Sequence, residues 1–141
     1  MTPERYNLEL AVLKNYLPEN IFVFRDMGTA MPYLLMAART NSGHVYTLRI
    51  ELDTFPNKVP KVFVKQMLKN KDGVDLDFPS HSMHTLNSEY GFTRICHHGS
   101  NSWTPNVSLY KIYIKCRLWL EMYELHLKTG NDIAYYLNRQ S

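Results

Sequence analysis

The run from Val107 to Lys128 limits the possible folds more than any other part of the sequence. Within this run, apolar residues recur at helical spacing in two stripes. The first contains Val107, Tyr110, Ile114, Leu118, Met122 and Leu125. The second contains Leu109, Ile112, Cys116, Leu120, Tyr123 and Leu127. Because apolar residues occupy more than one face, we expect a long helix that is largely buried. Thr104 or Pro105 would open this helix and Gly130 would end it.

A second helix is predicted at the N-terminus. Thr2 and Pro3 form a start signal, and Pro18 ends the helix at Leu17 because the residue before proline disfavours helical backbone. Four strand-like runs follow, of which the third alternates most clearly between polar and apolar residues: 21–24, 31–39, 44–53 and 62–64.

The segment 65–104 has no clear periodicity, and an irregular stretch of this length in a compact domain usually has a function. A short helix is expected within 131–138. The order of elements predicts an α+β fold: an N-terminal helix, a four-stranded antiparallel meander, a long irregular segment and a buried C-terminal helix. We expect one domain spanning 1–141.

Composition excludes several classes of function. A net charge of +3 over 141 residues, with one modest cluster of lysines, does not predict nucleic-acid binding. No apolar run is long enough for a membrane span, and two cysteines are too few for a disulfide framework, so we expect a cytoplasmic protein. No glycine-rich phosphate loop is present, so no nucleotide cofactor is predicted.

The two cysteines lie in different settings. Cys116 falls in an apolar stripe of the long helix and is expected to be a core residue. Cys96 lies in the polar segment, where Arg94, His97 and His98 would favour its thiolate. From local chemistry alone Cys96 is a nucleophile, a metal ligand or an inert thiol. The metal hypothesis adds two more histidines, His81 and His84, but lacks the paired short spacings typical of zinc sites.

Three motifs in the same order resemble those of the ubiquitin-conjugating enzymes. "FPNKVPKVFV" is similar to the family's proline-rich strand motif, and "HTLNSEYGFTRIC" is similar to a loosened His-Pro-Asn segment leading to Ile-Cys. "WTPNVSLYKI" resembles the family's Trp-Ser-Pro and the helix after it. The resemblance covers nearly the whole chain and implies the ubiquitin-conjugating fold.

The resemblance implies that Cys96 accepts the C-terminus of a protein donor as a thioester and passes it to an amine. Asn87 would support the loop or the oxyanion, and His97 and His98 are candidates for assisting the amine. The resemblance also implies three residues that bind substrate or form the wall of the active site: His84, Trp103 and Pro105. No metal is expected. The implied protein partner is a ubiquitin-like protein or another acyl donor, with or without a separate activating enzyme.

The sequence departs from the family pattern at two places. The proline of the His-Pro-Asn motif is missing, and His97 and His98 follow Cys96. These departures resemble divergent bacterial conjugating enzymes of antiphage operons with cyclic-oligonucleotide signalling. There the implied donor is the C-terminus of a cGAS-like nucleotidyltransferase. Two alternatives stay open: a non-catalytic interaction module of the same fold, and a His/Cys metal-binding protein.

Overall fold

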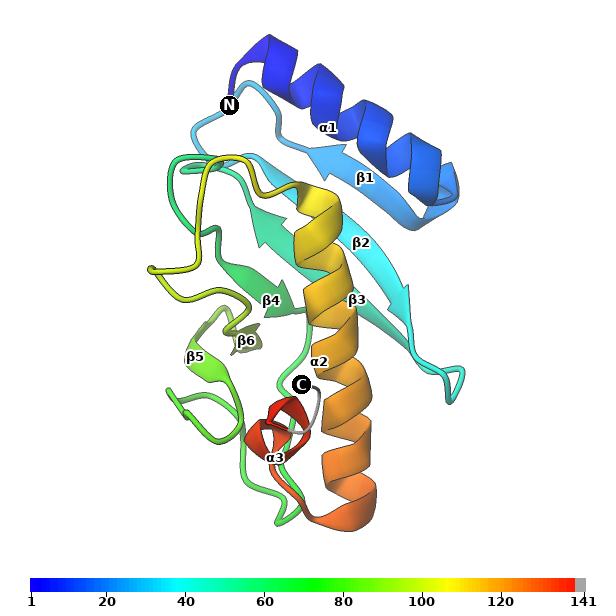
Figure 1. Cartoon of the computed structure of the whole chain (residues 1–141), viewed down its shortest axis with the longest axis vertical. Coiled ribbons are helices and arrows are strands. Elements are labelled where there is room, and N and C mark those ends of the chain that lie inside the picture. The colour runs from blue at the N-terminus through cyan, green and yellow to red at the C-terminus, as the bar shows by residue number, and fades with distance from the viewer. Residues whose placement is uncertain (139–141) are drawn as a thin grey trace.

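A computed structural model describes residues 1–138, so the last three residues of the expected domain lie outside the described range. Within it, three α-helices and one 3₁₀ helix (Glu19–Ile21) accompany one six-stranded antiparallel sheet of order β1-β2-β3-β4-β6-β5 (Figure 1). The elements are α1 (Pro3–Tyr16), β1 (Phe22–Arg25), β2 (Tyr33–Arg39), β3 (Val45–Glu51), β4 (Val62–Val64), β5 (Thr85–Glu89), β6 (Phe92–Ile95), α2 (Leu109–Thr129) and α3 (Ile133–Leu137).

Helix α1 has the predicted ends. The Thr2 hydroxyl accepts a hydrogen bond from the Arg5 N–H at 3.1 Å, and Leu17 takes an extended conformation ahead of Pro18. The helix lies beside β1 at one edge of the sheet (Figure 1). No helix within residues 1–138 is long and apolar enough to cross a membrane.

The first four strands form the predicted meander. Strands β2 and β3 pair in a register that sets Leu34 opposite Ile50 and Met36 opposite Leu48. Alternate residues of both strands are buried in the core, while the residues between them are more exposed. Helix α2 lies across the sheet in Figure 1, and the Tyr113 hydroxyl on it donates to the Ala37 carbonyl of β2 at 3.0 Å.

The prediction of four strands and an irregular segment over 65–104 is wrong, because two further strands lie within it. Strands β5 and β6 form a hairpin whose two loop residues, Tyr90 and Gly91, both have positive φ, 61° and 74°. That conformation matches the right-handed twist of antiparallel strands. Strand β6 then pairs with β4, so the hairpin extends the sheet and carries the segment that ends at Cys96.

Helix α2 ends as predicted but begins four residues later than Thr104 or Pro105 would place it. Its N-cap is Ser108, whose hydroxyl accepts from the Lys111 N–H at 3.0 Å. The buried Glu9 carboxylate of α1 accepts from the Leu109 N–H at 2.8 Å. This side chain therefore satisfies one of the backbone N–H groups that a helix start leaves unpaired.

The expectation that α2 is largely buried is correct for most of one apolar stripe, apart from the exposed Leu127, and for part of the other. Leu109, Ile112, Cys116 and Leu120 are fully buried. The other stripe is partly solvent-exposed, because the sheet covers a single face of the helix: Ile114, Leu118 and Leu125. Gly130 closes the helix with φ 84°, a left-handed conformation that glycine adopts without strain. Helix α3 follows in the predicted place.

Candidate functional site

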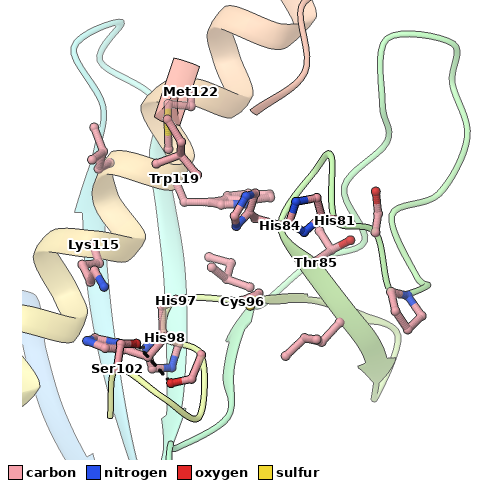
Figure 2. A pocket seen from close by; sticks show the side chains of 17 residues that line it. His81, His84, Thr85, Cys96, His97, His98, Ser102, Lys115, Trp119 and Met122 are labelled. Atoms are coloured by element: carbon pink, nitrogen blue, oxygen red, sulfur yellow. Dashed lines mark hydrogen bonds between the residues drawn. The ribbon is translucent and has the colours of Figure 1, made fainter. Parts of the chain in front are cut away.

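A pocket of about 570 Å³ lies between the β5–β6 hairpin, the loop after β6 and helix α2. It brings together Cys96 and four histidines that are separated by up to seventeen positions in the sequence, His81, His84, His97 and His98. Figure 2 shows Cys96 between His81 and His84 on one side and His97 and His98 on another. The fold therefore places the cysteine and the four histidines of this segment around one pocket.

Strand pairing places Cys96 beside His84. Thr85 is paired with Ile95, and the next step of the antiparallel ladder sets the Cys96 N–H on the His84 carbonyl at 2.9 Å. The backbone of the hairpin thus holds Cys96 and His84 side by side at the end of the sheet, and both line the pocket.

His84 has a left-handed backbone, with φ 50°. Non-glycine residues rarely adopt this conformation, and where they do so the surrounding structure must hold them. Burial, and after it the nearby charge of His81, lowers the pKa of His84 below its ordinary value, so the ring is neutral at pH 7. The His81 and His84 ring centroids are 5.5 Å apart. His84 therefore presents a neutral ring to the pocket, beside the ring of His81.

His97 and His98 form a short hydrogen-bonded chain from the backbone to the pocket. His97 Nε2 lies 2.8 Å from the Pro60 carbonyl oxygen, which can only accept, so the proton of neutral His97 is on Nε2. His97 Nδ1 must then accept from His98 Nδ1, 2.8 Å away. The remaining nitrogen, His98 Nε2, has a free lone pair. The Pro60 carbonyl therefore fixes which nitrogen of His98 can take up a proton.

Both histidines are neutral at pH 7. Burial lowers the pKa of His97 to about 4, opposed by the Pro60 hydrogen bond and reinforced by the charges of His98, Lys115 and Arg94. Burial also lowers the pKa of His98 to about 4, with the cations Lys115 and Lys111 acting in the same direction. An imidazole that stays unprotonated at pH 7 is available to accept a proton from a substrate.

Lys115 adds a cation to the pocket that the sequence did not single out. It reaches the pocket from α2 toward the side that holds His98 (Figure 2). Burial lowers the pKa of Lys115, as does the charge of Lys111, whereas the two cysteine sulfurs, Cys116 and Cys96, favour its charged form. Lys115 and Cys96 therefore line the same pocket, with the lysine on its α2 side.

Apolar residues form the other part of the pocket wall, and they too were missed in the sequence. Leu118, Trp119 and Met122 come from the face of α2 that carries Lys115, and Leu137 comes from α3. The Trp119 ring is fixed by its N–H, which donates to the Met83 carbonyl at 3.0 Å, and by stacking on Tyr123. The spacings of Leu118, Trp119 and Met122 from Lys115 (three, four and seven residues) are the only sequence signal that relates them.

Three of the predicted site residues do not line the pocket. Asn87 is exposed on β5, and its predicted role at the oxyanion stays a prediction without support from this geometry. Trp103 lies behind the wall: its ring meets His98 edge to face at 5.5 Å, and its N–H donates to the Pro56 carbonyl. Pro105 is exposed, and its carbonyl accepts from the Arg5 guanidinium at 2.5 Å.

Cys116 is the core residue predicted, fully buried, and burial raises its pKa. Across residues 1–138, no three His, Cys, Asp or Glu side chains are arranged to hold a metal ion. The metal-binding alternative therefore finds no ligand group to support it among the described residues.

Searches of protein-family models, of curated proteins and of solved structures found no match to this chain. The argument for function therefore rests on the arrangement of residues in the pocket.

Proposed function

We propose that the protein is a ubiquitin-conjugating-like acyl transferase with Cys96 as its nucleophile. The observation that carries the proposal is that Cys96 shares one pocket with His98, a neutral imidazole that has one free nitrogen. The order of helix, four strands, cysteine-bearing segment and covering helix agrees with the resemblance to that family. The β5–β6 hairpin would be a variation within the fold.

The proposed reaction has two acyl-transfer steps. The Cys96 thiolate attacks the carbonyl carbon of an activated donor, forms a thioester and releases the donor's original leaving group. An amine then attacks the same carbonyl, its proton passes to His98 Nε2, and the C–S bond breaks to give an amide and the free Cys96 thiolate. Lys115 supplies a positive charge near the oxygen that becomes negative in each step.

The remaining residues would orient these groups. His97 positions His98 through the Nδ1–Nδ1 hydrogen bond, and Trp103 packs against His98 from behind. His84 stands beside Cys96 and would contact the bound acyl group. Among the described residues that line the pocket, none is acidic, so the site complements the carboxyl-derived end of a donor.

The donor in this proposal is the C-terminus of a protein partner, activated elsewhere as an acyl adenylate or thioester. Following the resemblance, a cGAS-like nucleotidyltransferase of a bacterial antiphage system in the cytoplasm is the proposed donor. A second candidate function, a non-catalytic interaction module, is favoured by one observation: Asn87, the counterpart of the family's asparagine, lies outside the pocket.

A peptide with a C-terminal thioester of a small thiol separates these two functions without an activating enzyme. We expect intact mass spectrometry to find one acyl adduct that dithiothreitol removes. The adduct should be absent in Cys96→Ala and retained in Cys116→Ala. An interaction module would give no thiol-labile adduct, or an adduct that persists in Cys96→Ala, although iodoacetamide alkylates the wild-type thiol.

A further inference from the structure

The pocket beside Cys96 has two chemically different ends, and the proposed reaction uses only one of them. Lys115, Leu118, Trp119 and Met122 lie at positions i, i+3, i+4 and i+7 of α2, so they form one stripe along the helix. The stripe begins with a cation near His98 and continues with three apolar side chains. Figure 2 shows Trp119 and Met122 on one side of Cys96, and His98 and Ser102 on the other.

The apolar end is long enough for a short peptide segment. The apolar part of the stripe runs from Leu118 to Met122, four positions that correspond to about 6 Å along a helix at 1.5 Å per residue. An extended chain rises about 3.3 Å per residue, so this part matches about two residues. A volume of about 570 Å³ is within the usual range for pockets that enclose a ligand.

The walls of this end are rigid and apolar. Trp119 and Met122 line this end and are only 2% and 3% exposed, so they form a closely packed floor. Leu118 forms the rim with an exposed fraction of 36%. A donor that ends in glycine would leave the apolar rim in contact with water, whereas a large apolar side chain would cover it.

Charge fixes the orientation of the donor. The polar end holds Lys115, and the nearby charge of Lys111 also acts on His98 there. None of the described residues that line the pocket is acidic. The developing negative charge on the acyl oxygen is stabilised there, next to Cys96. The side chain of the last residue then points along α2 toward Trp119 and Met122.

We propose that this apolar end is a specificity pocket for the acyl donor, and that the donor ends in a large apolar residue such as leucine rather than in glycine. The proposal rests on the function proposed above. In the acylation step the Cys96 thiolate forms the new C–S bond and the donor's thiolate leaves, so the donor side chain takes no part in the chemistry and contributes binding alone.

Two peptide thioesters that differ only in the last residue, Leu or Gly, test the proposal. The rate of Cys96 acylation is measured by intact mass and divided by the rate of the same thioester with free N-acetylcysteine, which removes the intrinsic reactivity of each donor. We expect the corrected ratio to favour the leucine donor at least tenfold, which is about 1.4 kcal/mol.

A pair of matched variants locates the preference. Leu118→Asn alters the rim, and Ile114→Asn makes a similar change one turn earlier on α2, at a side chain that is 43% exposed and outside the pocket. The leucine preference should fall at least threefold in Leu118→Asn and stay unchanged in Ile114→Asn. A corrected ratio of one or less in the wild type, or equal losses in both variants, overturns the specificity pocket while leaving the acyl transferase intact. Failure of both thioesters to acylate a Cys96 that iodoacetamide alkylates overturns the proposed function itself.

Discussion

The hydrogen bond between His97 and His98 determines which imidazole can act on a substrate. His97 is held by the Pro60 carbonyl at one nitrogen and by His98 at the other, so it has no nitrogen left for a proton in transit. His98 keeps Nε2 free and lines the pocket. From the sequence, His97 and His98 are equivalent candidates for the base, because both directly follow Cys96. No sequence signal shows that the carbonyl of Pro60, 37 residues before His97, distinguishes the two rings.

His98→Gln should separate the two steps of the proposed reaction. Because Gln cannot accept a proton as a base, transfer from the Cys96 thioester to an added alkylamine should slow about 100-fold, while formation of the thioester changes little. The test is a single-turnover experiment in which the thioester is formed first and amide formation is followed by mass. His44→Gln, an exposed histidine outside the pocket, is the control. Equal aminolysis rates in all three proteins would remove His98 from the mechanism.

The lowered pKa values also predict how stability depends on pH. His97 has a folded-state pKa of about 4 against an ordinary value of 6.5, so the unfolded chain binds more protons between these values. Its contribution to stability is complete above pH 6.5 and is lost as the pH falls toward 4. Between pH 6.5 and 5 we expect a loss of about 2 kcal/mol from this buried residue.

Urea unfolding monitored at several pH values measures this slope, and the window above pH 5 avoids most carboxylate titration. His98 and His84 act in the same direction, because their pKa values are lowered too. The variant His97→Gln should flatten the profile in this range. A wild-type stability that stays constant from pH 6.5 to 5 would contradict the buried neutral state of His97.

At the scale of elements, α1 and α2 are joined by one buried carboxylate. Glu9 accepts from the Leu109 N–H at 2.8 Å and from Arg5 Nε at 2.7 Å, and the Arg5 guanidinium also donates to the Pro105 and Val107 carbonyls. The loop that follows the pocket thus reaches α2 along a path fixed by α1. Motion of this loop relative to the sheet would displace His98 as well.

Glu9→Ala should therefore destabilise the whole fold. It leaves the buried Leu109 N–H unpaired and removes the partner of Arg5, which together cost about 2–4 kcal/mol. The free energy of unfolding from urea titration measures the effect. Glu4→Ala removes an exposed carboxylate from the first turn of the same helix, where we expect a loss below about 1 kcal/mol. Similar values for the two variants would show that the Glu9 contact contributes little.

Elements that depend on local signals were predictable. The Thr2 cap, the alternation of β3 and the left-handed Gly130 each depend on residues within one turn or one strand. The β5–β6 hairpin was missed because tyrosine is an unusual first residue for its two-residue loop. Tertiary contacts hold Tyr90 at positive φ: its ring packs on Phe63, and its hydroxyl donates to Glu51 at 3.3 Å.

At the scale of the whole molecule, the sequence predicts the part of the site that lies near Cys96 in the chain and not the part that α2 contributes. Cys96 and its neighbouring histidines are close in the chain, so their clustering followed from the sequence. Lys115, Trp119 and Met122 come from α2, which lies across the sheet, and the sequence could not show which of its two apolar stripes would meet the hairpin. The N-cap at Ser108, with a contact from α1, sets that rotation.

Whether Cys96 carries an acyl group is decided by intact mass spectrometry after incubation with a peptide thioester. We expect one added acyl mass that dithiothreitol removes, that disappears in Cys96→Ala and that remains in Cys116→Ala. We also expect that Cys96→Ser traps the acyl group as an ester that dithiothreitol does not remove rapidly. An adduct that persists in Cys96→Ala, or a wild-type thiol that iodoacetamide alkylates but no thioester acylates, would contradict this role of Cys96.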